Sequence, residues 1–187
     1  MRVYIAALVA AVATGTGILY GQPRPPAEMY APGWNLIGAT PGTVISGAIG
    51  PLYTYQDGDV VYEPIPVATV GSPAGAALGG PRAGLGYWAY FSEPTELPLM
   101  LAGPRPLPGG QANGASNFVV PIPPQHWIMI GNPFSGPVTV TGADAVYAYD
   151  SASGYQQTTT LRPGQGAFAY SEAGGTVDMC PSNLTCQ

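Results

Sequence analysis

Short apolar and aromatic runs, separated by glycine and proline, fill the chain from residue 33 onward. The strongest run is residues 86–91. There Tyr87 and Phe91 fall on one face of a strand, and Trp88 and Tyr90 fall on the other. Beyond the first twenty residues, no ten-residue window is both free of glycine and proline and helical in its periodicity. The pattern predicts an all-β protein built from short strands and turns.

The pattern is written twice. Trp34 and Gly38 recur 93 residues later as Trp127 and Gly131. Further matches follow in the same order: Tyr53, Tyr55, Tyr62, Gly86, Trp88 and Tyr90 pair with Tyr147, Tyr149, Tyr155, Gly166, Phe168 and Tyr170. The spacing drops to 80 after residues 68–84, a stretch rich in glycine, alanine and proline, so the length difference lies in a loop. An internal repeat is therefore predicted.

Each copy has five to six short strands, too few to bury both faces of a sheet alone. We therefore predict two homologous modules packed as a pseudo-symmetric β-sandwich or barrel-like pair, preceded by an N-terminal apolar helix. The predicted order is a signal peptide or uncleaved membrane anchor at 1–21, a Pro-rich spacer at 22–32, β-module 1 at 33–101, a Gly/Pro linker at 102–117, β-module 2 at 118–179 and a tail at 180–187.

The first residues are typical of an export segment. Met1-Arg2 supplies a short positive region, and residues 3–20 carry no charge. The sequence at 11–13, Ala-Val-Ala, offers a cleavage site with small residues, whereas the length of the apolar stretch lies at the lower edge of a membrane span. Both alternatives place the remainder outside the cytoplasm: secreted, at the cell surface or on the periplasmic face of a membrane. Retention would add membrane contact through residues 3–20.

The number and sign of the charged residues restrict the classes of ligand that the protein is expected to bind. Charged residues make up 8% of the chain, the net charge is −5, and lysine is absent. The five arginines are scattered, so no basic patch is predicted to follow a phosphate backbone, and nucleic-acid binding is disfavoured. The lack of lysine also removes Schiff-base and phosphate-loop chemistry. No cofactor is predicted.

Cys180 and Cys186 are the only cysteines, and they lie close together at the C-terminus. In an exported protein such a pair predicts a small disulfide loop. Two free thiols or half of a metal site are the alternatives, but no other cysteine and no nearby histidine completes a metal site.

Catalytic groups are few. His126 is the only histidine, so a triad would have to use it, yet it stands at a predicted strand opening. Asp57, Asp59 and Asp150 fall at predicted turns, where aspartate hydrogen-bonds the local backbone. We predict neither catalytic nor metal-ligating residues.

Together these residues resemble a module of bacterial secreted and surface proteins. Its marks are the Gly-Trp-Asn-Leu-Ile-Gly opening at 33–38, repeated with changes at 126–131, and the closing Gly-x-Gly with aromatics at 84–88 and 164–168. The second copy has His126 where glycine is usual and Phe168 where tryptophan is usual. The resemblance implies non-catalytic β-domains attached to exported proteins.

The aromatic residues allow two interpretations. A tryptophan on a short strand bounded by glycine is expected in the core, as is the large aromatic residue of the closing strand. The expected core residues are Trp34 and Trp127 in the opening strands and Trp88 and Phe168 in the closing strands. Alternation leaves some tyrosines for surface contact, namely Tyr87, Tyr90, Tyr147 and Tyr149. Exposed rings would suit stacking on sugars.

The leading functional hypothesis is a structural or accessory subunit of a surface or membrane assembly, whose partners are other envelope or surface protein subunits. It rests on the export segment, the scarcity of charge and the lack of catalytic groups. A carbohydrate-binding module with glycan partners is the alternative, and an extracellular hydrolase is the least favoured.

Overall fold

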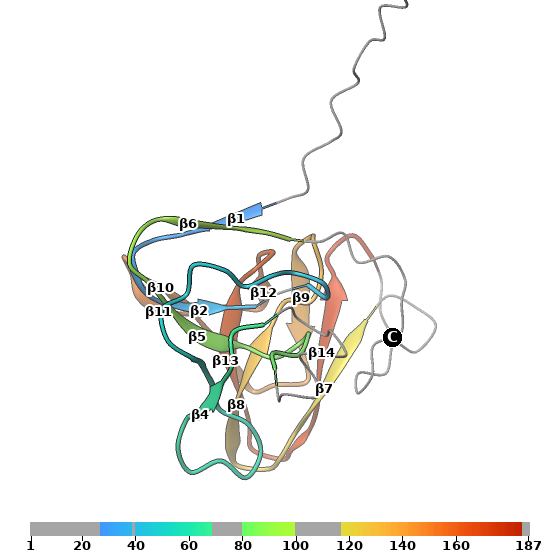
Figure 1. The fold of residues 1–187 in the computed structure, drawn as a ribbon. Coiled ribbons are helices and arrows are strands. Elements are labelled where there is room, and N and C mark those ends of the chain that lie inside the picture. The colour runs from blue at the N-terminus through green and yellow to red at the C-terminus, as the bar shows by residue number, and fades with distance from the viewer. Residues whose placement is uncertain (1–26, 39, 69–79, 100–116, 185–187) are drawn as a thin grey trace, which may run out of the picture.

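The computed structural model describes residues 27–38, 40–68, 80–99 and 117–184. Within these ranges all regular elements are β-strands, which form antiparallel sheets without a helix or a closed barrel. Figure 1 shows the sheets gathered into one sandwich-like body. The all-β prediction is confirmed. The predicted N-terminal helix, the loop at 69–79 and most of the linker lie outside the described residues.

The strands fall into two series. The first half of the chain contains β1 (Ala27–Tyr30), β2 (Gly33–Ile37), β3 (Leu52–Thr54), β4 (Glu63–Ile65), β5 (Tyr87–Phe91) and β6 (Thr95–Pro98). The second half contains β7 (Phe118–Ile122), β8 (His126–Gly131), β9 (Val138–Thr141), β10 (Ala145–Asp150), β11 (Gly154–Gln157), β12 (Thr160–Leu161), β13 (Gly166–Ser171) and β14 (Gly175–Pro181).

The sequence repeat is visible in the strand order. One four-stranded sheet has the order β2-β5-β3-β4, and another has the order β8-β13-β10-β11. The repeat aligns these strands one to one, so the two sheets correspond strand by strand. The pair β1-β6 likewise corresponds to β7-β14, which in the second half is extended by β9 and β12.

The segment predicted as a spacer is partly a strand. Residues 27–30 form β1, which pairs with β6 from Ala27 opposite Pro98 to Tyr30 opposite Thr95. Tyr30 is buried and stacks on Phe91 at a centroid distance of 5.6 Å. The first half therefore begins before residue 33. The physical reason is that Tyr30 has apolar surface to bury and β6 offers a free edge.

The core lies on the inner faces of the sheets. In the first half it contains Ile37, Leu52 and Phe91, and in the second half Ile128 and Ile130, all almost without exposure. These side chains belong to one continuous cluster that includes both halves. Burial of a side chain of this size contributes about 1.5–3 kcal/mol. Sharing one core favours folding of the two halves as a unit.

Four glycines allow the two halves to meet. A Cβ on Gly38 would lie 2.7 Å from the Cα of Gly131, and a Cβ on Gly131 would lie 2.6 Å from the Cα of Gly38. Gly86 approaches the carbonyl oxygen of Ile130, and Gly166 that of Ile37, in the same reciprocal manner. The Gly38 N–H donates to the Gly164 carbonyl at 2.6 Å, and the Gly131 N–H donates to the Gly84 carbonyl at 3.0 Å. The glycines of the repeat are thus contact points between the halves.

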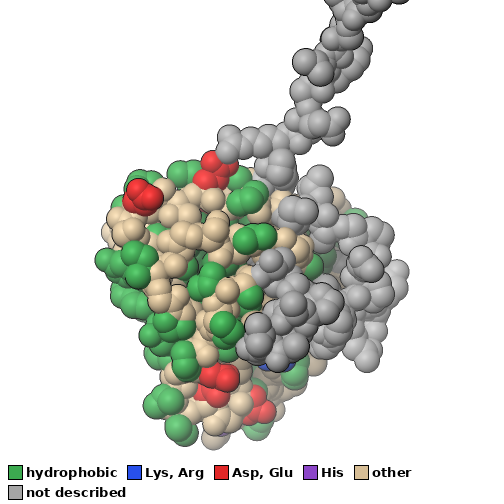
Figure 2. Space-filling model, viewed as in Figure 1, with side chains coloured by type: hydrophobic (Ala, Val, Ile, Leu, Met, Phe, Trp, Pro, Cys, Tyr) green, Lys and Arg blue, Asp and Glu red, His purple; other side chains and the backbone are tan. Residues whose placement is uncertain are grey.

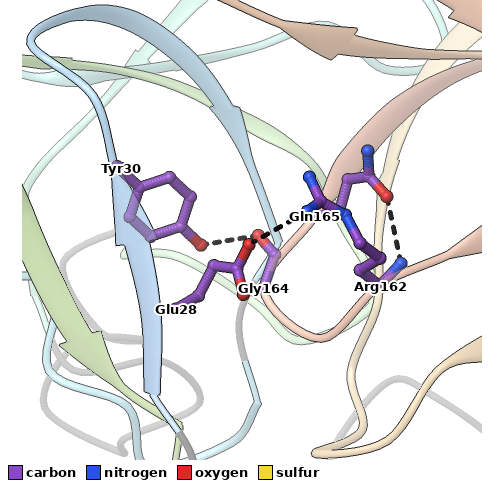
Figure 3. A network of polar contacts seen from close by, with 5 residues as sticks. All are labelled: Glu28, Tyr30, Arg162, Gly164 and Gln165. Carbon is purple, nitrogen blue, oxygen red and sulfur yellow. Dashed lines mark hydrogen bonds and ion pairs between the residues drawn. The ribbon is translucent and has the colours of Figure 1, made fainter.

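The first strand of each half also reaches the other half. Figure 3 shows the Tyr30 hydroxyl donating to the Gly164 carbonyl at 2.7 Å, beside Glu28 and Arg162, whose charged atoms are 3.9 Å apart. At Gly84, the equivalent of Gly164, the Phe118 ring covers the glycine, where a Cβ would overlap it. The ion pair contributes little, because the Arg162 side chain is 62% exposed. The buried hydrogen bond of Tyr30 and the packing of Phe118 on Gly84 are therefore the main contacts of these strands with the other half.

Candidate functional site

The two tryptophans that open the repeats are not core residues. Trp34 keeps 47% of its side chain exposed, and Trp127 keeps 39%. Both point away from the inner face, because their neighbours in alternation, Asn35 and Ile128, are buried. The prediction of core positions for Trp34 and Trp127 is wrong. Trp88 and Phe168, also predicted as core, are half-buried on the same outer faces.

The surface prediction for Tyr87 is wrong as well. Tyr87 is 2% exposed and lies on the inner face of β5. Its hydroxyl accepts a hydrogen bond from the Arg82 N–H at 2.7 Å, and burial raises the pKa of Tyr87 to about 12. The alternation predicted for residues 86–91 has the right period, and the inner face of β5 is the one that carries Tyr87 and Phe91. Tyr90 is exposed as predicted, and Tyr147 and Tyr149 are half-buried.

Trp34, Tyr53 and Tyr90 form what we term the first aromatic cluster. Trp34 lies opposite Tyr90 in the β2–β5 pairing, with ring centroids 5.4 Å apart, and its centroid is 5.9 Å from that of Tyr53. Both contacts are edge-on, with interplanar angles of 69° and 61°. Such contacts fix the orientation of the indole.

Trp127, Tyr147 and Tyr170 form the second aromatic cluster at the equivalent positions. Trp127 lies opposite Tyr170 in the β8–β13 pairing, at a centroid distance of 5.0 Å, and 6.0 Å from Tyr147. The rings are tilted by 38° and 49°, so they are closer to parallel than those of the first aromatic cluster.

Further aromatic contacts join the two halves. Trp88 contacts Tyr149 at 4.9 Å and Tyr155 at 6.5 Å, both from the other half. Tyr155 in turn contacts Phe168 at 6.1 Å. In this group Trp88 and Phe168 are half-buried, whereas Tyr155 is 51% exposed. Figure 2 shows hydrophobic side chains spread over one side of the molecule, with few charged groups among them.

A polar rim adjoins the second aromatic cluster. The Tyr170 hydroxyl donates to Glu172 Oε2 at 2.5 Å, and Gln125 Nε2 donates to Glu172 Oε1 at 2.9 Å. The Glu172 N–H donates to Asp144 Oδ2 at 2.7 Å. The hydrogen bonds from Tyr170 and Gln125 lower the pKa of Glu172, so it is charged at neutral pH. Gln125 and Glu172 belong to no motif that the sequence shows. Gln125 lies two residues before Trp127, and Glu172 lies two residues after Tyr170, so their closeness to repeat positions is the one sequence signal that could have found them.

Gln125 is also conformationally unusual. Its φ is +57°, the left-handed region that non-glycine residues seldom adopt. This backbone places its N–H on the Ser171 carbonyl at 2.7 Å and its amide on Glu172. The turn between β7 and β8 is therefore shaped so that the Gln125 amide reaches the rim.

His126, Asp59 and Asp150 make contacts within their own turns. A ring nitrogen of His126, Nδ1, lies 3.0 Å from the Pro124 carbonyl. Asp59 accepts from the Gln56 N–H, and Asp150 accepts from the N–H groups of Ala152 and Ser153, which lower the pKa of Asp150. These aspartates perform the turn chemistry predicted for them. Within the same residues no group of histidine, cysteine and carboxylate side chains is arranged to hold a metal ion.

Asn132 is a buried structural residue that the sequence analysis passed over. It has no exposed surface, and its amide donates to the carbonyls of Gly136 and Leu161 at 2.9 and 3.1 Å. Its Oδ1 accepts from the Phe134 N–H at 2.8 Å. Asn132 thus links the loop that follows β8 with strand β12. Its buried side-chain amide has a hydrogen-bond partner at both the nitrogen and the oxygen, so its burial leaves no polar atom unpaired.

The terminal predictions fall mainly outside the described residues. Cys180 is buried in β14, but Cys186 lies beyond the last described residue, so the bridge between them stays a prediction. Residues 3–20 also lie outside. A search of the part of the chain that the structure describes finds no helix suited by length and hydropathy to crossing a membrane.

Comparison with known proteins gives no relative. No family model matches the chain, and neither a curated protein nor a solved structure matches it. The resemblance to modules of secreted and surface proteins stays a prediction, and the function must be argued from the aromatic clusters themselves.

Proposed function

We propose that this protein is a non-catalytic, exported binding protein of the cell envelope that holds carbohydrate on its two aromatic clusters. One observation carries the proposal: Trp34 and Trp127 are exposed at equivalent positions of the two halves, each in contact with two tyrosines. The sequence pattern predicts core positions for Trp34 and Trp127, so their exposure needs a reason.

Exposure of a tryptophan is unfavourable. Each Å² of apolar surface left in water forgoes about 25 cal/mol. Single exposed apolar residues are ordinary, but grouped aromatic residues mark interaction sites. Here the grouping occurs twice with the same three positions. A ligand that covers the rings accounts for both occurrences.

Carbohydrate fits the chemistry of the clusters. The C–H faces of a sugar ring stack on aromatic faces, and tyrosine hydroxyls remain available at the edge of the stack. The chain has no lysine and few arginines, which disfavours phosphate-rich ligands. An envelope location, the predicted disulfide between Cys180 and Cys186 and the export segment at 1–21 belong to the same proposal, because surface glycans are met outside the cytoplasm.

The proposal predicts that the double variant Trp34→Ala/Trp127→Ala loses binding to insoluble glycans. We expect the wild-type protein to sediment with at least one of cellulose, chitin and peptidoglycan, and the double variant to remain in solution. Removal of a central aromatic contact typically costs about 2 kcal/mol or more, roughly 30-fold in affinity for each site. Both side chains are on the surface, so the fold should persist, which circular dichroism would verify.

The matched control is Val60→Ser/Val61→Ser. These valines are 91% and 71% exposed in the turn after β3, apart from both clusters, and their replacement should leave sedimentation unchanged. If the wild-type protein binds none of the three glycans, or if the double variant binds as well as the wild type, the carbohydrate proposal is wrong.

A structural or accessory subunit is the second candidate, and the same valines favour it. A turn that exposes the adjacent Val60 and Val61 to this degree is suited to contact with another envelope protein. In that case Val60→Ser/Val61→Ser would lose partners that co-purify from the native envelope, whereas the double tryptophan variant would keep them.

A further inference from the structure

The two aromatic clusters have the same rings but different rims. Glu172 stands two residues after Tyr170, where the first half has Ser92 after Tyr90. Asp144 corresponds to Ile49 in the first half. The Asp144 N–H donates to the Tyr170 carbonyl at 2.8 Å, and the Ile49 N–H donates to the Tyr90 carbonyl at the same distance, 2.8 Å.

The third rim residue differs too. Gln125 lies two residues before Trp127, and Pro32 holds that place before Trp34. Proline has no side-chain polar group and no N–H. The polar rim of glutamine, aspartate and glutamate in the second half is thus replaced by proline, isoleucine and serine in the first half.

Resting on the proposed function, we propose that the second aromatic cluster is the selective site, and that it binds a sugar chain without acidic groups, whose hydroxyl groups donate to Glu172. The first aromatic cluster then serves as a less selective stacking surface for the same chain.

The carboxylate of Glu172 suits this role. Each of its oxygens already accepts one hydrogen bond, Oε2 from Tyr170 and Oε1 from Gln125. A carboxylate has about four lone-pair sites, so further donors can be accepted. Glu172 is exposed, and the two bonds hold it beside Tyr170, whose ring contacts Trp127. A sugar stacked on Trp127 would therefore present its edge hydroxyls to an oriented acceptor.

The charge of the rim disfavours an anionic ligand. Asp144 and Glu172 are both carboxylates at the rim, so an anionic sugar would be repelled. A sugar chain without acidic groups avoids this repulsion.

The test is binding of soluble hexamers to the full chain, measured by titration calorimetry. The hexamers are of β-linked glucose, N-acetylglucosamine, glucosamine and galacturonic acid, which supply two neutral chains, one cationic and one anionic. We expect a hexamer without acidic groups to bind best, and the galacturonic acid hexamer to bind most weakly. Trp127→Ala should weaken that binding about 30-fold, Glu172→Gln about 10-fold and Trp34→Ala about 3-fold.

Thr141→Ala, an exposed change on β9, is the matched control and should bind as the wild type does. Thermal melting separates binding from folding, because the exposed positions should shift the midpoint by no more than about 2 °C. Equal losses for Trp34→Ala and Trp127→Ala, an unaltered affinity for Glu172→Gln, or preference for the anionic hexamer would overturn the inference while leaving the proposed function standing. Failure of the wild-type protein to bind all four hexamers would overturn both.

Discussion

Gly131→Ala should be among the most destabilising single substitutions in this protein. The new Cβ would lie 2.6 Å from the Cα of Gly38 and closer still to the Leu85 carbonyl oxygen. Neither neighbour is a side chain that can rotate away, since both belong to the backbone. The two halves would have to separate locally, which also strains the hydrogen bond from the Gly131 N–H to the Gly84 carbonyl.

We expect the free energy of unfolding to fall by about 3 kcal/mol or more, at the upper end for overpacking of a core. For a chain of this size the melting midpoint would fall by roughly 6–12 °C. The control is Gly136→Ala, because a Cβ at Gly136 meets nothing within 4 Å. Calorimetry of Gly131→Ala and Gly136→Ala compares their melting midpoints with that of the wild type. A Gly131→Ala protein that melts together with Gly136→Ala would show that the halves do not meet as described.

Alkaline pH should destabilise the fold strongly. Burial raises the pKa of Tyr87 to about 12 and raises that of Tyr30 further. Both tyrosines are neutral in the folded state over a range where the unfolded chain, with an ordinary pKa of about 10, has lost its protons. Their stabilising effect is therefore complete below pH 10 and is lost as pH rises through 10 to 12.

Each such group lowers the free energy of unfolding by about 1.4 kcal/mol per pH unit in that window. Urea unfolding between pH 9 and 11.5 should show a slope of up to about 2.8 kcal/mol per pH unit from the pair. Tyr87→Phe should be less stable than the wild type at pH 7, since the Arg82 N–H loses its acceptor, yet its slope above pH 10 should be about half as steep. A flat wild-type stability from pH 9 to 11.5 would contradict the burial of these hydroxyls.

Much of the architecture could be predicted because it depends on local periodicity. The alternation of residues 86–91 predicts a strand, and β5 occupies Tyr87–Phe91. The order of aromatic residues and glycines predicts a repeat, and the strand orders of the two large sheets correspond. What alternation does not settle is which face turns inward, since both faces of β5 carry large rings.

The inner face of β5 is decided by what the other strands supply. Tyr87 and Phe91 meet the buried Ile37 and Leu52, whereas Trp88 and Tyr90 meet other aromatic residues near solvent. That choice reversed the expected roles of the tryptophans and of Tyr87. It depends on contacts between distant segments, which a single run of sequence does not contain.

Strands held by tertiary contact were missed for the same reason. β1 is short and flanked by prolines, and it forms because Tyr30 is buried against Phe91 and Gly164. In β14, Val177 and Met179 face the core, and Asp178 between them faces the other way. The glycines before this segment and Pro181 after it hide the alternation that would predict a strand. The rim of the second aromatic cluster was invisible because Gln125 and Glu172 meet only in the folded chain.

Contact of Trp34 and Trp127 with a sugar ligand can be observed at their indole groups. The chain has three tryptophans, so a nitrogen–proton correlation spectrum should show three indole signals. On titration with the hexamers of β-linked glucose and N-acetylglucosamine, we expect the signals of Trp127 and Trp34 to move, with that of Trp127 moving first, while that of the half-buried Trp88 moves least. Indole signals that stay fixed with both hexamers would show that these tryptophans do not contact the sugar.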